Sequence, residues 1–298
     1  MAEAPIARWV GIVLLLVMAT VFGLNHIAAR IAFEHGANVT TAVAVRSTGT
    51  ALFVLALLFL SGTSLQVERK TFVRSVAIGL LVAIQSYCLY SAVSLIPVAL
   101  ALLAFQTFPM VLAVISWLAG GERPSRRVRI AMPVALAGLA LALDVVGKSA
   151  DVAGRWSAIG AGVLWAGGAS LSFALALFLT TRWQAVMDGR LRSFLTMSVV
   201  AVVTLAGGAL GSGFALPADG TGWAALGLLT LFYGSAITAM FVLLPRLGAV
   251  NNAAVLNFEP ISVLGIAWVV LGQAVAPSQI LGAFVVVGAI MWMGAGKK

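Results

Sequence analysis

Long stretches without a charged side chain are the feature that most limits how this chain can fold. They cover residues 9–29, 47–67, 75–121, 156–181, 193–218, 220–245 and 260–296. Charged residues make up only 9% of the sequence, against about 25% in soluble domains. So few charges cannot cover the water-facing surface of a soluble chain of 298 residues. The sequence therefore excludes a soluble enzyme, a nucleic-acid-binding protein and a disordered chain, and it predicts an all-α integral membrane protein.

The number of membrane-spanning helices follows from the lengths of these runs. A spanning helix needs about 20 apolar residues. The run 75–121 is too long for one helix and divides at Pro97, because proline breaks or caps helices. The run 260–296 divides in the same way between Gly272 and Pro277, and residues 129–147 add a further span. We predict ten transmembrane helices, at 9–29, 39–60, 71–95, 98–119, 128–147, 156–181, 191–212, 220–244, 250–271 and 277–295.

The positions of the basic residues predict the orientation in the membrane. If the N-terminus is cytoplasmic, 14 of the 18 Lys and Arg residues fall in cytoplasmic segments. The outer loops then hold only Arg30, Lys148 and Arg155, and Arg46 lies inside the second span. Cytoplasmic loops of membrane proteins carry such an excess of bases. We therefore predict a multi-pass protein of a cell membrane, the inner membrane of a bacterium, with both termini in the cytoplasm.

The two halves of the chain resemble each other, which indicates a duplication. Two matches have an offset of 148 positions: Gly79-Leu80-Leu81 with Gly227-Leu228-Leu229, and Pro97 with Pro245. Two more have an offset of 151 positions: Phe105-Gln106-Thr107-Phe108-Pro109 with Leu256-Asn257-Phe258-Glu259-Pro260, and Trp117 with Trp268. We predict two five-helix repeats, at residues 1–149 and 150–298. Since five is odd, the second repeat enters the membrane inverted, as in many secondary transporters that bind their substrate near the midplane.

Several motifs resemble those of a known family. They are Phe-Glu-Pro at 258–260, Gln-Thr-Phe-Pro at 106–109, Arg46 in the second span and Trp165-Ala-Gly-Gly in the sixth. With the five-plus-five duplication, they are similar to the drug/metabolite transporter superfamily in its EamA-domain branch, and most similar to the bacterial aromatic amino acid exporters. The resemblance covers nearly the whole chain and implies a transporter of small solutes. The first repeat departs from the pattern, because Thr20 stands in the place of Trp165.

Charged side chains inside the membrane are costly and are therefore candidates for function. Glu259 is expected near the midplane, either as a proton-coupling carboxylate or as a neutral group that links helices beside Pro260. Arg46 is expected in the outer part of the second span. It either attracts a substrate carboxylate, extends outward to the interface or pairs with Asp144. Asn25 and His26 are expected near the outer end of the first span. His26 is expected to be a capped or interfacial residue, with a proton relay as the alternative.

Aromatic and amide side chains predict a substrate cavity. Its expected lining is Trp165, Tyr87, Tyr90, Phe105, Phe108, Gln85 and Gln106, which are placed at mid-depth or in the outer half of the membrane. Such a lining would stack against an apolar or aromatic side chain and attract an ammonium by cation–π interaction. The alternative is that these rings are ordinary core residues, or, for Tyr90, part of the interfacial aromatic belt.

Small residues and prolines predict how the helices pack and bend. Pro97, Pro109, Pro245 and Pro260 are candidate hinges. Gly207 with Gly211, and the set Gly282, Gly288 and Gly294, are expected to allow close helix contacts. The single cysteine, Cys88, excludes an internal disulfide and a cysteine-based zinc site. With only two histidines, we predict neither a metal site nor a cofactor.

The sequence therefore predicts a secondary transporter that exports small organic solutes, with aromatic or neutral amino acids as the first choice. It would work by alternating access around a midplane cavity, as a facilitator, either as a monomer or as a weak homo-oligomer in the bilayer. The alternative is proton-coupled efflux of drugs or other metabolites. An intramembrane enzyme is not expected, because no catalytic cluster of His, Glu, Asp or Ser is visible. A membrane scaffold that transports nothing is the alternative from another class.

Overall fold

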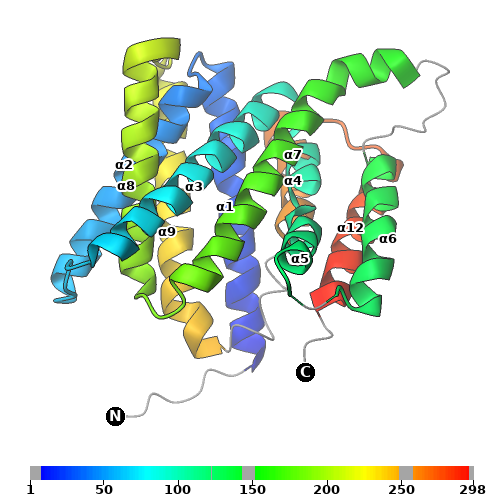
Figure 1. Cartoon of the computed structure of the whole chain (residues 1–298). Coiled ribbons are helices and arrows are strands. Elements are labelled where there is room, and N and C mark those ends of the chain that lie inside the picture. The colour runs from blue at the N-terminus through cyan, green and yellow to red at the C-terminus, as the bar shows by residue number, and fades with distance from the viewer. Residues whose placement is uncertain (1–7, 122, 143–151, 248–257, 295–298) are drawn as a thin grey trace.

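The computed structural model describes residues 8–121, 123–142, 152–247 and 258–294, and all regular structure in these ranges is helical (Figure 1). The elements are α1 (Arg8–Glu34), α2 (Val39–Leu60), α3 (Arg69–Leu95), α4 (Val98–Phe105), α5 (Phe108–Leu118), α6 (Arg126–Ala142), α7 (Val152–Trp183), α8 (Gly189–Gly207), the π-helix η1 (Gly208–Ser212), α9 (Gly220–Leu247), α11 (Glu259–Leu271) and α12 (Pro277–Gly294). The predicted all-α class is confirmed for these residues.

Six helical segments of the described residues are long and apolar enough to cross a membrane. They are Val13–Glu34, Val39–Leu60, Arg69–Leu95, Val98–Leu118, Ile159–Trp183 and Gly189–Gly211. Two further apolar helices, Glu259–Leu271 and Pro277–Trp292, are shorter. The described part of the predicted fifth span ends at Ala142, and that of the ninth begins at residue 258. Ten spans therefore remain a prediction.

Three of the four candidate hinge prolines lie at the start of a helix. The predicted turn at Pro97 is confirmed, since α3 ends at Leu95 and α4 begins at Val98. The predicted span 98–119 is broken into α4 and α5, because Pro109 has no N–H to donate to the carbonyl of Phe105. In the second half, α11 begins at Glu259 with a proline as its second residue. These two helix starts, Phe108 and Glu259, are the positions that the duplication pairs.

Three predicted boundaries differ from the structure by three or more residues. α7 begins at Val152 instead of residue 156, so Arg155 lies in a helix. α1 continues to Glu34 instead of ending near residue 29, so Arg30 lies in a helix and not in an outer loop. Its guanidinium donates to Glu34 Oε1 at 2.7 Å and to the carbonyls of Val93 and Ser94 at the end of α3. α9 runs past Pro245 to Leu247, while the side chain of Pro245 lies outside the described residues.

The helix contacts are arranged with the symmetry of two repeats. α3 packs on α7 as α1 packs on α9, and α3 packs on α8 as α2 packs on α9. Two further pairs, α2 with α8 and α6 with α12, join equivalent helices of the two halves. In Figure 1, α1 runs from the bottom to the top, whereas its equivalent α7 runs from the upper right to the lower left. Equivalent helices of opposite direction are what an inverted repeat requires.

Loops of the two repeats also contact each other, at the end of the helices for which the basic residues predict an outer position. His35 Nδ1 lies 2.7 Å from Asp219 Oδ2, and Asn38 Nδ2 donates to the carbonyl of Gly213. The pKa of the Asp219 carboxyl is held below its ordinary value, mainly by the backbone N–H of Gly222 and then by His35. This contact holds the α1–α2 connection against the segment that enters α9.

The predicted glycine contacts are only partly present. A Cβ on Gly282 of α12 would meet the backbone of Gly138 and Ala142 of α6, so this glycine allows the two helices to touch. Gly207, Gly211 and Gly288 have open space where a Cβ would stand, as far as the described residues show. Close packing of Gly207 and Gly211 on another described helix is therefore absent, and a contact between protomers at these glycines stays a prediction. Gly294 has no described side-chain surroundings.

Candidate solute and coupling site

Arg46 is buried between the two halves of the chain. Its side chain is 4% exposed, and its guanidinium donates to Tyr90 Oη at 3.2 Å and to Ser86 Oγ at 2.8 Å. The guanidinium carbon lies 4.8 Å from the ring centre of Tyr90 and 4.2 Å from that of Tyr233. Both distances are within the range of a cation–π interaction. Arg46 therefore lies between a ring of the first half and a ring of the second.

The structure decides one of the alternatives for Arg46. The extension of its side chain to the interface is wrong, because the guanidinium is enclosed by hydroxyl groups and aromatic rings. The pairing with Asp144 lies outside the described residues. α6, which leads toward Asp144, packs mainly on α12, so the chain before Asp144 lies away from α2.

Polar and aromatic residues that contact one another around Arg46 form a group that we call the polar cluster: Arg46, Ser86, Tyr90, Tyr233, Asn25 and His26. Tyr90 and Asn25 extend this cluster to α1. Tyr90 is fully buried, and its hydroxyl donates to Asn25 Oδ1 at 2.7 Å. Asn25 in turn donates to the carbonyl of Phe22 in the same helix. The aromatic-belt alternative for Tyr90 is therefore wrong: a belt residue keeps its hydroxyl in the headgroup region, whereas this hydroxyl is paired inside the protein.

His26 and Glu259 form a second polar contact between the halves. His26 Nε2 lies 3.6 Å from Glu259 Oε1, and the imidazole ring packs edge-on against Tyr90 with 5.7 Å between ring centres. A Cβ on Gly23 would collide with Val263, so this glycine lets α1 and α11 approach each other. The expected interfacial position of His26 is wrong, because α1 continues for two further turns beyond it.

Tyr87 and Trp165 line a pocket of about 570 Å³ between α3, α7 and α8. Their rings meet edge to face with 6.1 Å between centres, and they are 38% and 39% exposed. The other lining residues are Thr40, Leu80, Ala83, Ile84, Cys88, Val203, Thr204 and Gly207. Two of the predicted aromatic residues therefore do share one pocket with an apolar wall.

Phe105 and Phe108 belong to another group of rings. They contact each other and Phe173 of α7, with centres 4.9 to 5.5 Å apart. Gln106, between them in the sequence, is buried, whereas Gln85 is half-buried and accepts a hydrogen bond from Ser86 Oγ. The predicted lining residues thus fall into separate contact groups, and no described pocket contains all of them.

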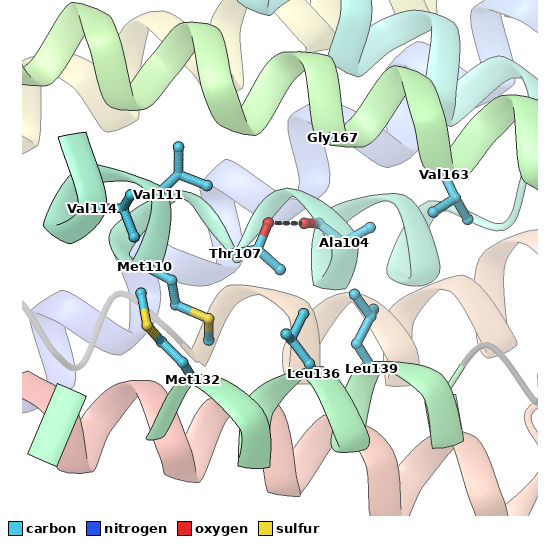
Figure 2. A pocket seen from close by; sticks show the side chains of 10 residues that line it. All are labelled: Ala104, Thr107, Met110, Val111, Val114, Met132, Leu136, Leu139, Val163 and Gly167. Carbon is cyan, nitrogen blue, oxygen red and sulfur yellow. Dashed lines mark hydrogen bonds between the residues drawn. The ribbon is translucent and has the colours of Figure 1, made fainter. Parts of the chain in front are cut away.

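A second pocket, of about 430 Å³, lies on the opposite side of α7. Figure 2 shows it between α4, α5, α6 and α7, with Met110 and Met132 pointing toward each other. Thr107 is its polar group: the hydroxyl donates to the carbonyl of Ala104 at 2.8 Å and lies 2.9 Å from Ser170 Oγ. A third pocket of about 490 Å³, between α11 and α12, is lined by apolar residues and Trp268. Both pockets have almost entirely apolar walls.

Comparison with known proteins identifies the family. The profile of the EamA-like transporter family matches residues 9–143 and, a second time, residues 160–295. This chain belongs to the EamA-like transporter family. A solved crystal structure is similar over 97% of this chain and 98% of its own, with 18% identity and a TM-score of 0.61, and this similarity concerns the fold alone. A comparison with curated proteins finds no match.

Membership of the EamA-like family makes this a membrane transporter of small solutes built from two repeats. Its polar cluster joins the two copies, since Arg46 contacts Tyr233 and His26 contacts Glu259. Transporters with inverted repeats commonly bind substrate or ions between their copies. Among the described residues, no three His, Cys, Asp or Glu side chains are grouped as metal ligands.

The sequence reasoning misplaced two members of the polar cluster of this EamA-like protein, Asn25 and His26, and missed a third, Tyr233. Asn25 and His26 were visible as adjacent polar residues in an otherwise apolar run, but their assignment to the helix end concealed their role. Tyr233 is one of only three tyrosines in the chain. Its contact with Arg46 is separated by 187 positions, so no local pattern points to it.

Proposed function

We propose that this EamA-like protein exports amino acids with apolar or aromatic side chains across the cytoplasmic membrane. The observation that carries the proposal is the pocket formed by Tyr87 and Trp165. Its volume of about 570 Å³ is within the range of small-molecule sites. Two partly exposed rings and an apolar wall fit a solute with an apolar or aromatic side chain better than a sugar or a phosphate.

Alternating access is the proposed mechanism. The two repeats, residues 1–149 and 150–298, would move against each other as inverted copies around the polar cluster. The proposed topology has ten spans, with both termini in the cytoplasm. Pro97, Pro109 and Pro260 lie at helix starts, and Pro245 near the end of α9, so we propose these four positions as hinges. Few charged groups lie inside the membrane, which favours a facilitator driven by the solute gradient.

The first test is uptake of a panel of amino acids into proteoliposomes. We expect Trp165→Ala to raise the KM for aromatic amino acids about ten-fold, because a stacking partner worth one to two kcal/mol is lost. The matched control is Trp117→Ala, since Trp117 is similarly exposed but lines none of the described pockets.

Two results would contradict this proposal. If Trp165→Ala and Trp117→Ala transport every substrate as the wild type does, the pocket is not the solute site. If no amino acid moves in the wild type while drugs or other metabolites do, the solute class is wrong. A protein that moves nothing on either panel would instead support the scaffold alternative.

Proton-coupled efflux is the second candidate, and the contact between His26 and Glu259 favours it. A carboxyl and an imidazole 3.6 Å apart interact electrostatically, and a closer approach of the two groups would bring them into hydrogen-bond range for proton exchange. Because His26 belongs to the first repeat and Glu259 to the second, a movement of the repeats would change their separation. Loading and release of a proton would then be linked to the conformational cycle.

A further inference from the structure

The charge of Arg46 has no described anionic partner. No carboxylate of the described residues lies within 4.0 Å of its guanidinium. The two nearest polar groups, Tyr90 Oη and Ser86 Oγ, are neutral hydroxyls. Glu259 is paired instead with His26, whose Nε2 lies 3.6 Å from its Oε1. A buried charge is costly unless an opposite charge compensates it, so this position attracts an anion.

Two buried hydrogen-bond donors on this side of α2 have no acceptor among the described residues. Arg46 Nε and Thr50 Oγ1 have no hydrogen-bond partner in the part of the chain that the structure describes. Thr50 is four residues after Arg46, so both side chains leave α2 on the same face. Ser47, by contrast, donates its hydroxyl hydrogen bond to the carbonyl of Val43 one turn earlier. Thr50 makes no such bond, which leaves its hydroxyl free for another acceptor.

We propose that Arg46 and Thr50 form a binding site for a small monovalent anion, between α2, α3 and α9. The anion would accept hydrogen bonds from Arg46 Nε and Thr50 Oγ1 and compensate the guanidinium charge. The donors of this site fit either the carboxylate of a transported solute or a free chloride ion. The carboxylate case rests on the proposed function, whereas the chloride case does not.

The position of the site connects it to both repeats. The guanidinium lies over Tyr90 of the first half and Tyr233 of the second, so a relative movement of α3 and α9 would open or close one side of it. Each Nη donates one of its two N–H groups, to Tyr90 and to Ser86, whereas the single N–H of Nε has no partner among the described residues and is the donor that we assign to the ligand. The binding mode is therefore a single charge-assisted bond helped by a hydroxyl.

The experiment measures the thermal stability of the purified full-length protein in detergent at constant ionic strength. Sodium chloride and sodium acetate are each titrated against sodium isethionate, whose anion is larger. Since a ligand that binds the folded state raises Tm, the concentration dependence yields an apparent Kd for each anion. We expect Thr50→Val to raise this Kd about ten-fold, because a hydrogen bond to a charged group is lost.

Thr48→Val is the matched control. Thr48 Oγ1 is also buried without a described partner, but it lies two positions from Arg46 and Thr50 and so faces another side of α2. We expect its Kd to equal that of the wild type. Arg46→Lys keeps the charge and removes Nε, and we expect it to lose the response. If this variant does not fold, Thr50→Val carries the test.

The outcomes separate the two sources of the anion. A response to chloride supports a free ion, and a response to acetate alone supports a solute carboxylate. The proposal is overturned if neither anion raises Tm above isethionate, or if Thr50→Val and Thr48→Val respond equally. Because binding is measured without transport, a failed transport panel leaves this result unaffected.

Discussion

Glu259 is the first residue of α11 and the only described carboxyl group in contact with the polar cluster. Replacing it by Gln keeps the size and removes the exchangeable charge. If coupling depends on Glu259, we expect Glu259→Gln vesicles to lose accumulation driven by a pH gradient and to keep downhill exchange. The measurement is solute uptake with an imposed pH gradient, compared with uptake driven by the solute gradient alone.

Glu34→Gln is the control for this change. Glu34 is an exposed residue at the end of α1 that pairs with Arg30, so its loss removes a carboxylate without touching the contact with His26. We expect its accumulation to remain at the wild-type level. Accumulation by Glu259→Gln that still follows the pH gradient would show that the protein is a facilitator or couples through another group.

At the level of helices, the contact between α6 and α12 depends on the absence of one side chain. Gly282→Ala would push a methyl group into the backbone of Gly138 and Ala142, which cannot move aside without separating the helices. We expect a loss of about 1–3 kcal/mol in stability, typical of overpacking. Thermal unfolding of the purified protein, followed by its tryptophan fluorescence, measures this loss.

Gly288→Ala in the same helix is the matched control. Its Cβ would enter open space as far as the described residues show, so the substitution changes only helix propensity. Alanine is favoured over glycine by about 0.5–1 kcal/mol in a helix. We expect a Tm equal to or above that of the wild type. An equal loss in both variants would refute the importance of close contact at Gly282.

At the level of the whole molecule, the distribution of basic residues predicts which loops face outward. Cys88 is the only cysteine, so Cys88→Ala provides a background for single reporters. We expect an impermeant maleimide to label Ala215→Cys in intact cells, and Ser125→Cys only after the membrane is permeabilised. Ala215 lies in the segment before α9, and Ser125 lies between α5 and α6 among four arginines.

The opposite labelling pattern would place both termini outside the cell and would contradict the charge asymmetry. Labelling of both positions in intact cells would refute an odd number of spans between them. Ser125 and Ala215 are separated by the predicted spans 128–147, 156–181 and 191–212. The experiment therefore also tests whether the fifth predicted span, described only to Ala142, crosses the membrane.

The amino-acid sequence by itself determined the all-α class, the positions of most helices and the duplication. A helix in a bilayer satisfies its own backbone hydrogen bonds, so its existence depends on local apolar length. The starts of α5 beside Pro109 and of α11 beside Pro260 are local as well, because proline lacks the N–H that a continuing helix needs and fits the first turn of a new one. These features are readable without any knowledge of which helices touch.

Only the tertiary structure decided which side chains meet. Arg46 with Tyr233, and His26 with Glu259, join segments about 190 and 230 positions apart. The helices are apolar on nearly all faces, so the sequence does not indicate how each is rotated about its axis. For the same reason, Trp165 and Gly167 lie on opposite sides of α7 and line different pockets. The sequence predicted a single aromatic cavity, whereas the structure places these rings in separate groups. The difference arises because helix rotation and packing are set by contacts between distant segments.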